Sequence, residues 1–303
     1  MIDFQPFDIH NKSAYDAFLQ NTTGRGCEYS FVNLYLWGRQ RAAFLHDHLV
    51  FFSQFDRKSV YLFPVGNSDK KAVLDAIIQD AKERGIPCRL TGLTQGDCAL
   101  LEQLYPGKLR YHFDRNTFDY VYDIDDLADL KGKKFQKKRN HLNRFRAENP
   151  DHILQPICRE NIHLVEALVR KWYDLRQQAD PHADFHMEQA ALGKALKQYD
   201  LLGLEGLLLF IAGEPAAMTI GSRLNVDTFD IHFEKALDIT DGTYAAINNG
   251  FARYLREKYP DVRFLDREDD LGLEGLRKAK LSYNPHHLVE KSWAHLLEDG
   301  YDY

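Results

Sequence analysis

Three consecutive strand-like runs in the second half of the chain limit the fold more than any other feature. Residues 206–211, 216–224 and 228–234 are rich in apolar and β-branched side chains, and short turns separate them. These turns read Gly213-Glu214-Pro215 and Asn225-Val226-Asp227, residue types that favour reversal of the chain. We therefore expect an antiparallel meander.

The elements around the meander indicate a mixed α/β domain. A strand over 153–158 and amphipathic helices over 162–178 and 187–199 precede it. A helix over 243–259, a strand over 262–265, a short helix over 273–281 and a strand over 288–293 follow it. This order resembles the GNAT (N-acetyltransferase) fold, in which the fourth and fifth strands splay apart to admit an acyl donor.

The first half has a comparable order, so a degenerate second copy is expected. It has a strand pair over 49–55 and 60–65 joined at 56–58, a helix capped by Ser68, a strand over 88–91, a helix over 99–104 and a strand over 118–124. We predict an α/β (α+β) protein of tandem GNAT-like domains with mixed, largely antiparallel sheets. The charged stretch 123–134 places the boundary between domains 1–125 and 126–303.

Composition narrows the class of protein. The longest apolar run, 207–212, is far shorter than the roughly 20 residues that a membrane span needs, and the N-terminus lacks a secretion signal. Four scattered cysteines without a Cys-x-x-Cys pair fit a reducing compartment. We expect a cytoplasmic protein, or one peripheral to a membrane surface. The net charge of −6 means that any contact with nucleic acid or anionic lipid is local.

The densest cluster of charged residues directly follows the strand over 262–265. Five charged residues are consecutive: Asp266, Arg267, Glu268, Asp269 and Asp270. Two glycines, Gly272 and Gly275, come next, and the cations Arg277, Lys278 and Lys280 follow them. Ligands in open α/β sheets generally bind at such strand ends, and glycines allow close backbone approach. We expect a cleft lined by carboxylates and cations. Alternatively, the segment is a solvated loop with surface salt bridges.

The same segment carries a family resemblance. Gly275-Leu-Arg-Lys-Ala-Lys280-Leu-Ser-Tyr283 is similar to the ending of Fem-type peptidoglycan aminoacyltransferases, with Ala279 at the usual Phe position. Together with the early segment Tyr29-Ser-Phe-Val-Asn-Leu-Tyr-Leu-Trp37, it resembles the phosphatidylglycerol lysyltransferase C-terminal domain family over nearly the whole chain. The resemblance implies tandem GNAT-like domains. It also implies the activity of the membrane-anchored relatives, which transfer an amino acid from aminoacyl-tRNA to a lipid head group. The aromatics of 29–37 themselves favour a core helix over a ligand cage.

The resemblance suggests roles for the charged residues. Asp266 or Glu268 is expected to act as base or amine anchor. Arg277 and Lys280 are expected to bind phosphate or to steady developing negative charge. The predicted catalytic residues are Asp266, Glu268 and Lys280. Lys280→Ala is expected to abolish transfer and leave the fold intact. The predicted substrate contacts are Arg267, Asp269, Arg277, Lys278, Tyr283, Asp230, His232, Glu234 and Asp241.

The turn before the helix over 243–259 argues against acetyl-CoA. GNAT enzymes hold the CoA pyrophosphate on a glycine-rich turn at a helix N-terminus. Here only Gly242 remains, while Asp238 and Asp241 would repel a pyrophosphate and could instead hold a cationic amine. Alternatively, Thr240 or Asp241 simply caps the helix. No cofactor is expected, and aminoacyl-tRNA is the expected donor.

A basic helix is predicted over 131–148, at the start of the second domain. Phe135, Leu142 and Phe145 share one face of this helix. The cations that we expect to face outward and bind phosphates of tRNA or of an anionic membrane are Lys133, Lys134, Lys137, Lys138 and Arg144. The alternative is a solvated interdomain helix.

Two patterns remain open. Asp230, His232 and Glu234 alternate along one strand, so they share a face that either lines the cleft or forms an exposed sheet surface. His182 and His186 have zinc spacing but lack the glutamate of His-Glu-x-x-His, so no metal is expected.

We therefore predict an enzyme that moves an aminoacyl group to an amine or hydroxyl acceptor, such as a phospholipid head group or a small molecule. The alternatives are a non-catalytic ligand-binding protein and a CoA-dependent N-acyltransferase with an atypical pyrophosphate loop.

Overall fold

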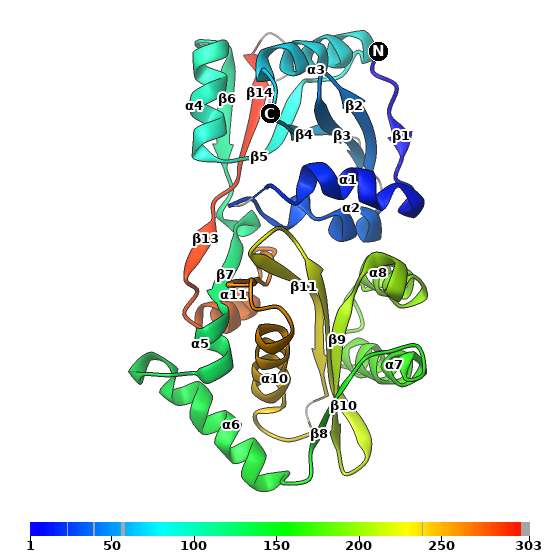
Figure 1. The fold of residues 1–303 in the computed structure, drawn as a ribbon, viewed down its shortest axis with the longest axis vertical. Coiled ribbons are helices and arrows are strands. Elements are labelled where there is room, and N and C mark those ends of the chain that lie inside the picture. The colour runs from blue at the N-terminus through cyan, green and yellow to red at the C-terminus, as the bar shows by residue number, and fades with distance from the viewer. Residues whose placement is uncertain (23, 39, 56–57, 238, 298–303) are drawn as a thin grey trace. The chain divides into compact units, whose positions relative to one another are not determined.

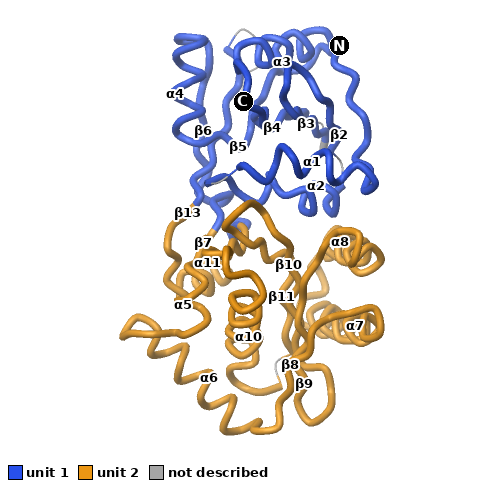
Figure 2. Tube along the Cα trace, in the orientation of Figure 1, with its two compact units in different colours: residues 1–119, 269–272, 289–303 blue, residues 120–268, 273–288 orange. Residues whose placement is uncertain are grey.

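Two sheets of seven strands organise the chain, and each belongs mainly to one of two compact units. The computed structural model describes residues 1–22, 24–38, 40–55, 58–237 and 239–297. Unit 1 comprises Met1–Asp119, Asp269–Gly272 and Val289–Tyr303, and unit 2 comprises Tyr120–Glu268 and Leu273–Leu288 (Figure 2). Each unit is thus assembled from separate stretches of sequence. The domain division 1–125 and 126–303 stays a prediction.

The sheet of unit 1 has the strand order β1-β2-β3-β4-β5-β14-β6. Its pairs are antiparallel except β4 with β5, which run parallel. The strands are β1 (Gln5–Pro6), β2 (Gln40–Leu45), β3 (His48–Phe55), β4 (Lys58–Gly66), β5 (Arg89–Leu93), β6 (Leu109–Phe113) and β14 (Ser292–Leu296). The predicted hairpin is confirmed as β3 and β4, although its turn residues 56 and 57 lie outside the described residues.

The helices of unit 1 are α1 (Lys12–Leu19), α2 (Phe31–Trp37), α3 (Lys70–Arg84) and α4 (Gln95–Leu104), with short 3-10 turns η1 (Ile9–Asn11), η2 (Cys27–Tyr29) and η3 (Arg115–Thr117). Asp69 caps α3 by accepting from the Lys71 N–H, whereas the Ser68 hydroxyl donates to the His46 carbonyl, so the predicted Ser68 cap is wrong by one residue. The aromatic segment forms η2 and α2, which bury Tyr29, Phe31 and Leu34, so its interpretation as core is confirmed.

The sheet of unit 2 has the order β13-β7-β12-β11-β10-β9-β8, and the predicted meander is its β9, β10 and β11. The strands are β7 (Asp119–Asp123), β8 (Ile153–Pro156), β9 (Glu205–Ile211), β10 (Glu214–Arg223), β11 (Thr228–Ala236), β12 (Phe264–Asp266) and β13 (His287–Val289). β11 and β12 run parallel. The single strand predicted over 288–293 is wrong, because Glu290 and Lys291 separate β13 from β14 and the two strands join different sheets.

Helices cover both faces of this sheet, and Figure 1 shows α10 on one side of β9–β11 and α7 and α8 on the other. The helices are α5 (Ile124–Asp129), α6 (Gln136–Glu148, preceded by η4, Lys133–Phe135), α7 (Ile162–Ala179), α8 (His186–Lys197), α9 (Tyr199–Leu202), α10 (Thr243–Lys258) and α11 (Glu274–Leu281). The core joins Phe251 and Leu255 of α10 to Phe229 of β11 and to Phe135, Leu142 and Phe145, the predicted apolar face of the basic helix. That face is confirmed.

Candidate functional site

A bulge in β11 shapes the region where the parallel strands β11 and β12 part. Ile231 pairs with Gly221 of β10 and Phe233 pairs with Ile220, so His232 is an extra residue between two regular pairs. Such a bulge bends its strand and redirects the side chains that follow. It occurs next to the last pair of β11 and β12, Asp230 with Asp266.

The bulge reverses the alternation of side chains along β11. Before it, Ile231 packs into the core beneath α10; after it, Glu234 is the residue that meets α10, where it accepts from the Asn248 amide at 3.3 Å. Asp230 and His232 instead meet each other on the other side of the strand. The prediction that Asp230, His232 and Glu234 share one face is therefore wrong, and so is the exposed-surface alternative, because Asp230 and His232 are buried.

Glu234 and Arg267 form a nearly buried ion pair. The guanidinium lies 2.8 Å from the carboxylate, with side-chain exposures of 14% for Arg267 and 10% for Glu234. Burial, the largest single effect, would lower the pKa of Arg267, but the charge of Glu234 and the nearby tyrosines together outweigh it, so the net pKa is raised. The rings of Tyr283 and Tyr122 lie 5.1 and 5.7 Å from the guanidinium carbon and complete its surroundings. Both predicted substrate contacts therefore already have protein partners.

His232 links a serine on one side to two carboxylates on the other. Its Nε2 lies 2.8 Å from the Ser222 hydroxyl. Its Nδ1 lies 3.4 Å from Glu268 Oε1 and 3.5 Å from Asp230 Oδ2. Only Glu268 reaches solvent appreciably, with 21% of its side chain exposed against 1% for His232 and 0% for Asp230. The structure thus brings together three of the predicted residues and adds Ser222.

A pocket of about 420 Å³ opens at the N-terminus of α10. Three regions that are far apart in sequence line it: α6, the turn before α10 with the first residues of α10, and the segment that follows α11. The lining residues are Lys138, His141, Ile239, Thr240, Asp241, Gly242, Thr243, Tyr244, Ala245 and Tyr283. The first N–H groups of a helix lack intrahelical partners and carry the positive end of its dipole, so this end of α10 favours negative charge.

Lys138 is the cation of this pocket. Its ammonium lies 3.7 Å from the centroid of the Tyr283 ring. Burial, followed by repulsion from Arg267, lowers the pKa of Lys138 to about 8. The prediction that Lys138 faces outward with the other lysines of the helix is therefore wrong, since one helix face turns into the pocket. At mildly alkaline pH, a large share of this lysine is a neutral amine that can accept a proton.

Asp241 and Gly242 form the rim of the pocket. The Asp241 carboxylate accepts from Arg144 at 2.7 Å and lies 3.0 Å from His141 Nδ1. The sequence predicts that Asp241 repels a phosphate, and this pairing offsets that repulsion. Asp238, the other predicted repulsive residue, lies outside the described residues. Gly242 has a φ of +89°, and a Cβ there would lie 2.5 Å from the His141 carbonyl oxygen, so the turn needs glycine.

Lys280 and Asp266 hold the backbone beside β12. The Lys280 ammonium donates to the main-chain carbonyls of Arg267 and Glu268, the latter at 3.1 Å. The Asp266 carboxylate accepts from the Glu268 N–H at 2.8 Å and is fully buried. These contacts fix the left-handed turn at Glu268, whose φ is +57°. The catalytic roles of Asp266, Glu268 and Lys280 stay predictions.

The remaining predicted residues lie elsewhere. Lys278 is exposed and pairs with Glu274 on α11, and Lys134 pairs with Asp126. Lys133 and Lys137 are exposed on or beside α6, Arg144 is exposed and bound to Asp241, Arg277 is half-buried on α11, and Asp269 belongs to unit 1. Gly275 has open space around its Cα, so close backbone approach is not its role.

The lining or linking residues that escape the sequence analysis include Ser222, His141 and Tyr244. Ser222 lies in an apolar strand, and its contact with His232 depends on the bulge. His141 could have been found, because it follows Lys138 by three residues on one helix and therefore shares its face. Tyr244 carries no recognisable pattern.

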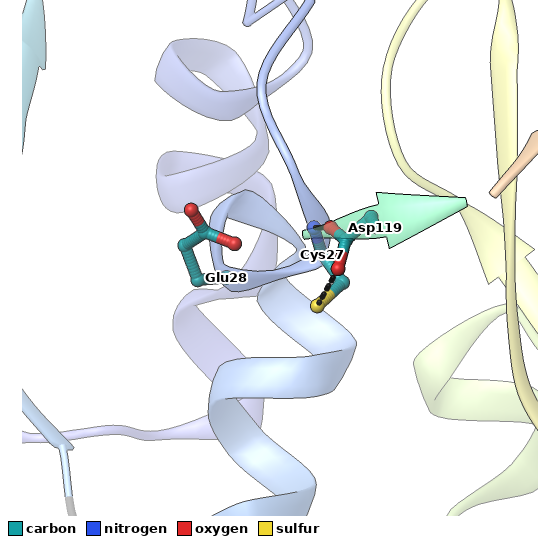
Figure 3. Close-up of side chains that lie close together, drawn as sticks. All are labelled: Cys27, Glu28 and Asp119. Carbon is teal, nitrogen blue, oxygen red and sulfur yellow. Dashed lines mark hydrogen bonds between the residues drawn. The ribbon is translucent and has the colours of Figure 1, made fainter. Parts of the chain in front are cut away.

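Unit 1 has a cluster of side chains whose chemistry could bind a metal ion. Cys27, Glu28 and Asp119 approach one another, and Figure 3 shows the Cys27 thiol directed at Asp119, 3.7 Å away. The Lys291 ammonium lies 2.8 Å from Asp119 and 2.6 Å from Glu28. These charges raise the pKa of Lys291 well above its ordinary value despite the opposing effect of burial. An ammonium thus already supplies the positive charge that these carboxylates need.

Unit 1 also has a larger open pocket, of about 720 Å³. N-terminal residues, β2 and α3 line it. It contains none of the residues that the sequence singles out, and we do not assign it a role in the chemistry.

Comparison with solved structures identifies the fold. A conserved protein of unknown function from Bacteroides thetaiotaomicron is 39% identical, with a TM-score of 0.93 over 98% of this chain and 100% of that one. L-PGS from Bacillus licheniformis has a TM-score of 0.69 at 16% identity, covering 98% and 94%. FemX has a TM-score of 0.61 at 12% identity, covering 98% of each chain. The predicted tandem GNAT-like fold is confirmed.

Sequence comparison identifies the family. A curated, uncharacterized protein of Mycoplasmoides gallisepticum is 26% identical over 178 residues, 58% of this chain and 55% of that protein, so the match spans about half the relative's length. Among the described residues, no helix has the length and apolar character needed to cross a bilayer. The family model described as "Phosphatidylglycerol lysyltransferase, C-terminal" matches residues 20–295, and the chain therefore belongs to this family.

Proposed function

We propose that this protein transfers an aminoacyl group from an activated ester, such as aminoacyl-tRNA, to an amine or hydroxyl acceptor. The reaction site is the pocket at the N-terminus of α10. Family membership supports the reaction class, and similarity to FemX, whose fold is shared, is consistent with it. A phospholipid head group or a small molecule would serve as acceptor.

The observation that carries this proposal is the convergence of three separate motifs on one pocket. Lys138 comes from the basic helix, Asp241 and Gly242 from the turn that replaces a CoA loop, and Tyr283 from the end of the Fem-like motif. Each motif is singled out by its own sequence pattern. Their meeting in one pocket supports a common ligand that has both phosphate and amine groups.

Lys138 supplies the chemistry that such a pocket requires. An acceptor amine or hydroxyl attacks the ester carbonyl carbon, a new C–N or C–O bond forms, and the ester C–O bond breaks to release the ribose oxygen. Neutral Lys138 accepts the proton that the acceptor loses and returns it to the leaving oxygen. The N–H groups at the start of α10 and the protonated lysine stabilise the tetrahedral oxyanion.

We assign this proton transfer to Lys138 in preference to Asp266 or Glu268. Asp266 is fully buried and occupied by the Glu268 N–H, and the Glu268 carboxylate lies beside His232. Lys138 faces the pocket itself. The exposed cations Lys133 and Lys137 would contact the phosphates of the donor, and this contact would weaken with added salt.

A transfer assay tests the proposal. The protein is incubated with a mixture of radiolabelled aminoacyl-tRNAs and a crude lipid and metabolite extract, and loss of label from tRNA is compared with spontaneous hydrolysis. We expect protein-dependent loss, reduced at least tenfold in Lys138→Met and little changed in Lys197→Met, which alters an exposed lysine at the end of α8 to which we assign no contact. Loss no faster than spontaneous hydrolysis would refute the transferase.

A CoA-dependent N-acyltransferase is the second candidate, because Arg144 and His141 offset the charge of Asp241 at the helix end where a pyrophosphate would lie. A thermal-shift titration with acetyl-CoA separates the two. Stabilisation by acetyl-CoA that Lys138→Met removes would favour this candidate over the aminoacyl donor.

A further inference from the structure

We propose that Asp230, His232 and Glu268 form a binding site for one divalent transition-metal ion in unit 2. Each offers one donor atom, and the three atoms all lie within 4.8 Å of one another. The donors are one imidazole nitrogen and two carboxylate oxygens. This site is separate from the pocket that Lys138 lines, so the inference does not rest on the proposed transfer reaction.

The spacing of the donor atoms fits a shared ion better than a set of hydrogen bonds. His232 Nδ1 lies 3.4 Å from Glu268 Oε1 and 3.5 Å from Asp230 Oδ2. Ordinary N–H···O bonds span about 2.7–3.2 Å. Donor atoms that bind one ion at about 2.1 Å stand roughly 3.4 Å apart in a tetrahedral arrangement. Both distances from Nδ1 therefore match the edges of a metal coordination shell.

The surroundings of His232 are those of a metal ligand. The Ser222 hydroxyl lies 2.8 Å from Nε2 and can accept a hydrogen bond from the Nε2–H, a tautomer in which the lone pair of Nδ1 is directed at the carboxylates. Metal-binding histidines generally donate their other ring N–H in this way, which fixes the tautomer and the ring orientation. The His232 side chain is 1% exposed, so the ring is held in place.

The backbone also holds the site. The bulge inserts His232 beyond Asp230 on β11, and the parallel pair Asp230 with Asp266 sets β12 beside it. The turn that carries Glu268 is fixed by Asp266 and by Lys280, whose ammonium is engaged with the carbonyls of that turn. Glu268, with 21% of its side chain exposed, provides the route by which an ion enters.

The cluster in unit 1 provides a contrast within the same chain. There the Lys291 ammonium lies within 2.8 Å of two carboxylates, so a lysine occupies the position of a cation. In the His232 site, a ring nitrogen, which is itself a metal ligand, lies 3.5 Å from the Asp230 carboxylate and 3.4 Å from the Glu268 carboxylate.

The donor set selects the class of ion. One imidazole with two carboxylates suits first-row divalent ions such as Zn²⁺, Mn²⁺ or Co²⁺, whereas a site for Mg²⁺ or Ca²⁺ would favour oxygen donors alone. Sequence reasoning finds no metal here because only Asp230 and His232 are close in sequence, on β11, whereas Glu268 lies 36 residues after His232, in the turn that follows β12.

Metal titration of the full chain tests the site. Tag-free protein is stripped with a chelator and titrated with Zn²⁺ and Mn²⁺ by calorimetry and with Co²⁺ by visible absorption. We expect one ion per chain and a Co²⁺ spectrum of nitrogen and oxygen ligands. Glu268→Gln and His232→Asn should lower affinity at least tenfold, and Ser222→Ala by tenfold or more through the freed ring. Glu274→Gln, an exposed carboxylate, should have no effect.

A competing site is controlled directly. His286 and His287 are exposed with their Nδ1 atoms 2.9 Å apart, so the double variant His286→Gln/His287→Gln is titrated in parallel. The proposal would be overturned if the double variant lost binding, or if Glu268→Gln and His232→Asn kept it. It would also be overturned if the wild type showed no saturable binding. If the His232 and Glu268 variants do not fold, anomalous scattering from zinc-soaked wild-type crystals decides, with a peak among the three side chains expected.

Discussion

The ammonium of Lys138 lies 3.7 Å from the centroid of the Tyr283 ring, which joins the basic helix α6 to the residue that ends the Fem-like motif. Arg267 lies 5.1 Å from the same ring and pairs with Glu234. Two cations therefore contact one aromatic ring. Of the pair, Arg267 is the one that has the Glu234 carboxylate at hydrogen-bond distance. This difference explains why the pKa of Lys138 is lowered and that of Arg267 is raised.

The free energy of unfolding of the wild type should rise with pH because of Lys138, and Lys138→Met should remove this rise. The folded state lowers the pKa of Lys138 to about 8, so between about pH 8 and the ordinary value near 10.4 the unfolded chain binds more protons, and stability increases with pH. Because the side chain is only half-buried, the effect should be on the order of 1 kcal/mol. Urea unfolding near pH 7 and near pH 10 measures it.

The same experiment on Lys137→Met provides the control, since Lys137 is exposed. We expect the difference between wild type and Lys138→Met to change over this pH range and that for Lys137→Met to stay constant. Parallel pH profiles for all three proteins would contradict the buried environment of Lys138.

Much of the fold could be predicted from sequence because the hydrophobic periods are local. The apolar face of α6 and the meander β9 to β11 follow directly from spacing. The pairing of β14 with β5 and β6 could not be predicted, because it joins residues that are far apart in sequence, such as Ser292 with Leu93 and with Phe113. It also depends on a break at Glu290 and Lys291, a stretch that by sequence looks like a continuing strand.

The candidate site was harder to predict because its geometry depends on irregular backbone. Alternation along β11 predicts one shared face, but the extra residue at His232 sends Asp230 and Glu234 to different partners. Helical spacing could have told Lys138 apart from Lys137, because Lys138 precedes the buried residues Leu142 and Phe145 by four and seven positions and therefore borders the apolar face of α6. The turn at Gly242 retained a readable signal, since its φ of +89° requires glycine.

Gly242→Ala should destabilise unit 2 and disrupt the pocket. The new Cβ would lie 2.5 Å from the His141 carbonyl oxygen, a backbone atom that cannot rotate away, and the residue would keep a left-handed conformation. Together these should cost about 1–3 kcal/mol. Gly275→Ala is the matched control, because nothing lies within 4 Å of its Cβ position and alanine favours its helix. Equal unfolding midpoints for the two variants would count against this account of the turn.

Lys280→Ala should lower stability as well as activity, in contrast to the sequence-based expectation of an intact fold. Lys280 is 8% exposed, and its ammonium donates to the carbonyls of Arg267 and Glu268. Both carbonyls would lose this charged donor, although the Glu268 carbonyl would keep the Tyr120 N–H. Loss of hydrogen bonds from a charged group should cost about 1.5–3 kcal/mol. Lys278→Ala, on the same helix but exposed, should cost less than about 0.5 kcal/mol. Thermal unfolding compares them, and an unchanged midpoint for Lys280→Ala would restore the purely catalytic interpretation.

Lys291→Met should be the most destabilising of these substitutions. It leaves the carboxylates of Asp119, which is fully buried, and Glu28 without the ammonium that lies 2.8 and 2.6 Å from them. Breaking a buried pair in this way costs about 3–5 kcal/mol, whereas Lys71→Met, which breaks an exposed pair in the same unit, should cost less than about 1 kcal/mol.

The pH dependence of the Lys291 effect has a definite sign. Burial is the largest single effect and lowers the pKa of Lys291, but Asp119, Cys27 and Glu28 together outweigh it and raise the pKa above its ordinary value. The stabilisation is therefore fully present below about pH 10.4 and is lost at higher pH. The gap in unfolding free energy between wild type and Lys291→Met should therefore be constant near neutrality and narrow in strong alkali. Asp119→Asn combined with Lys291→Met should recover part of the loss, because it removes the buried charge that the single substitution strands; a double variant as unstable as the sum of the two singles would show that the pair does not act as a unit.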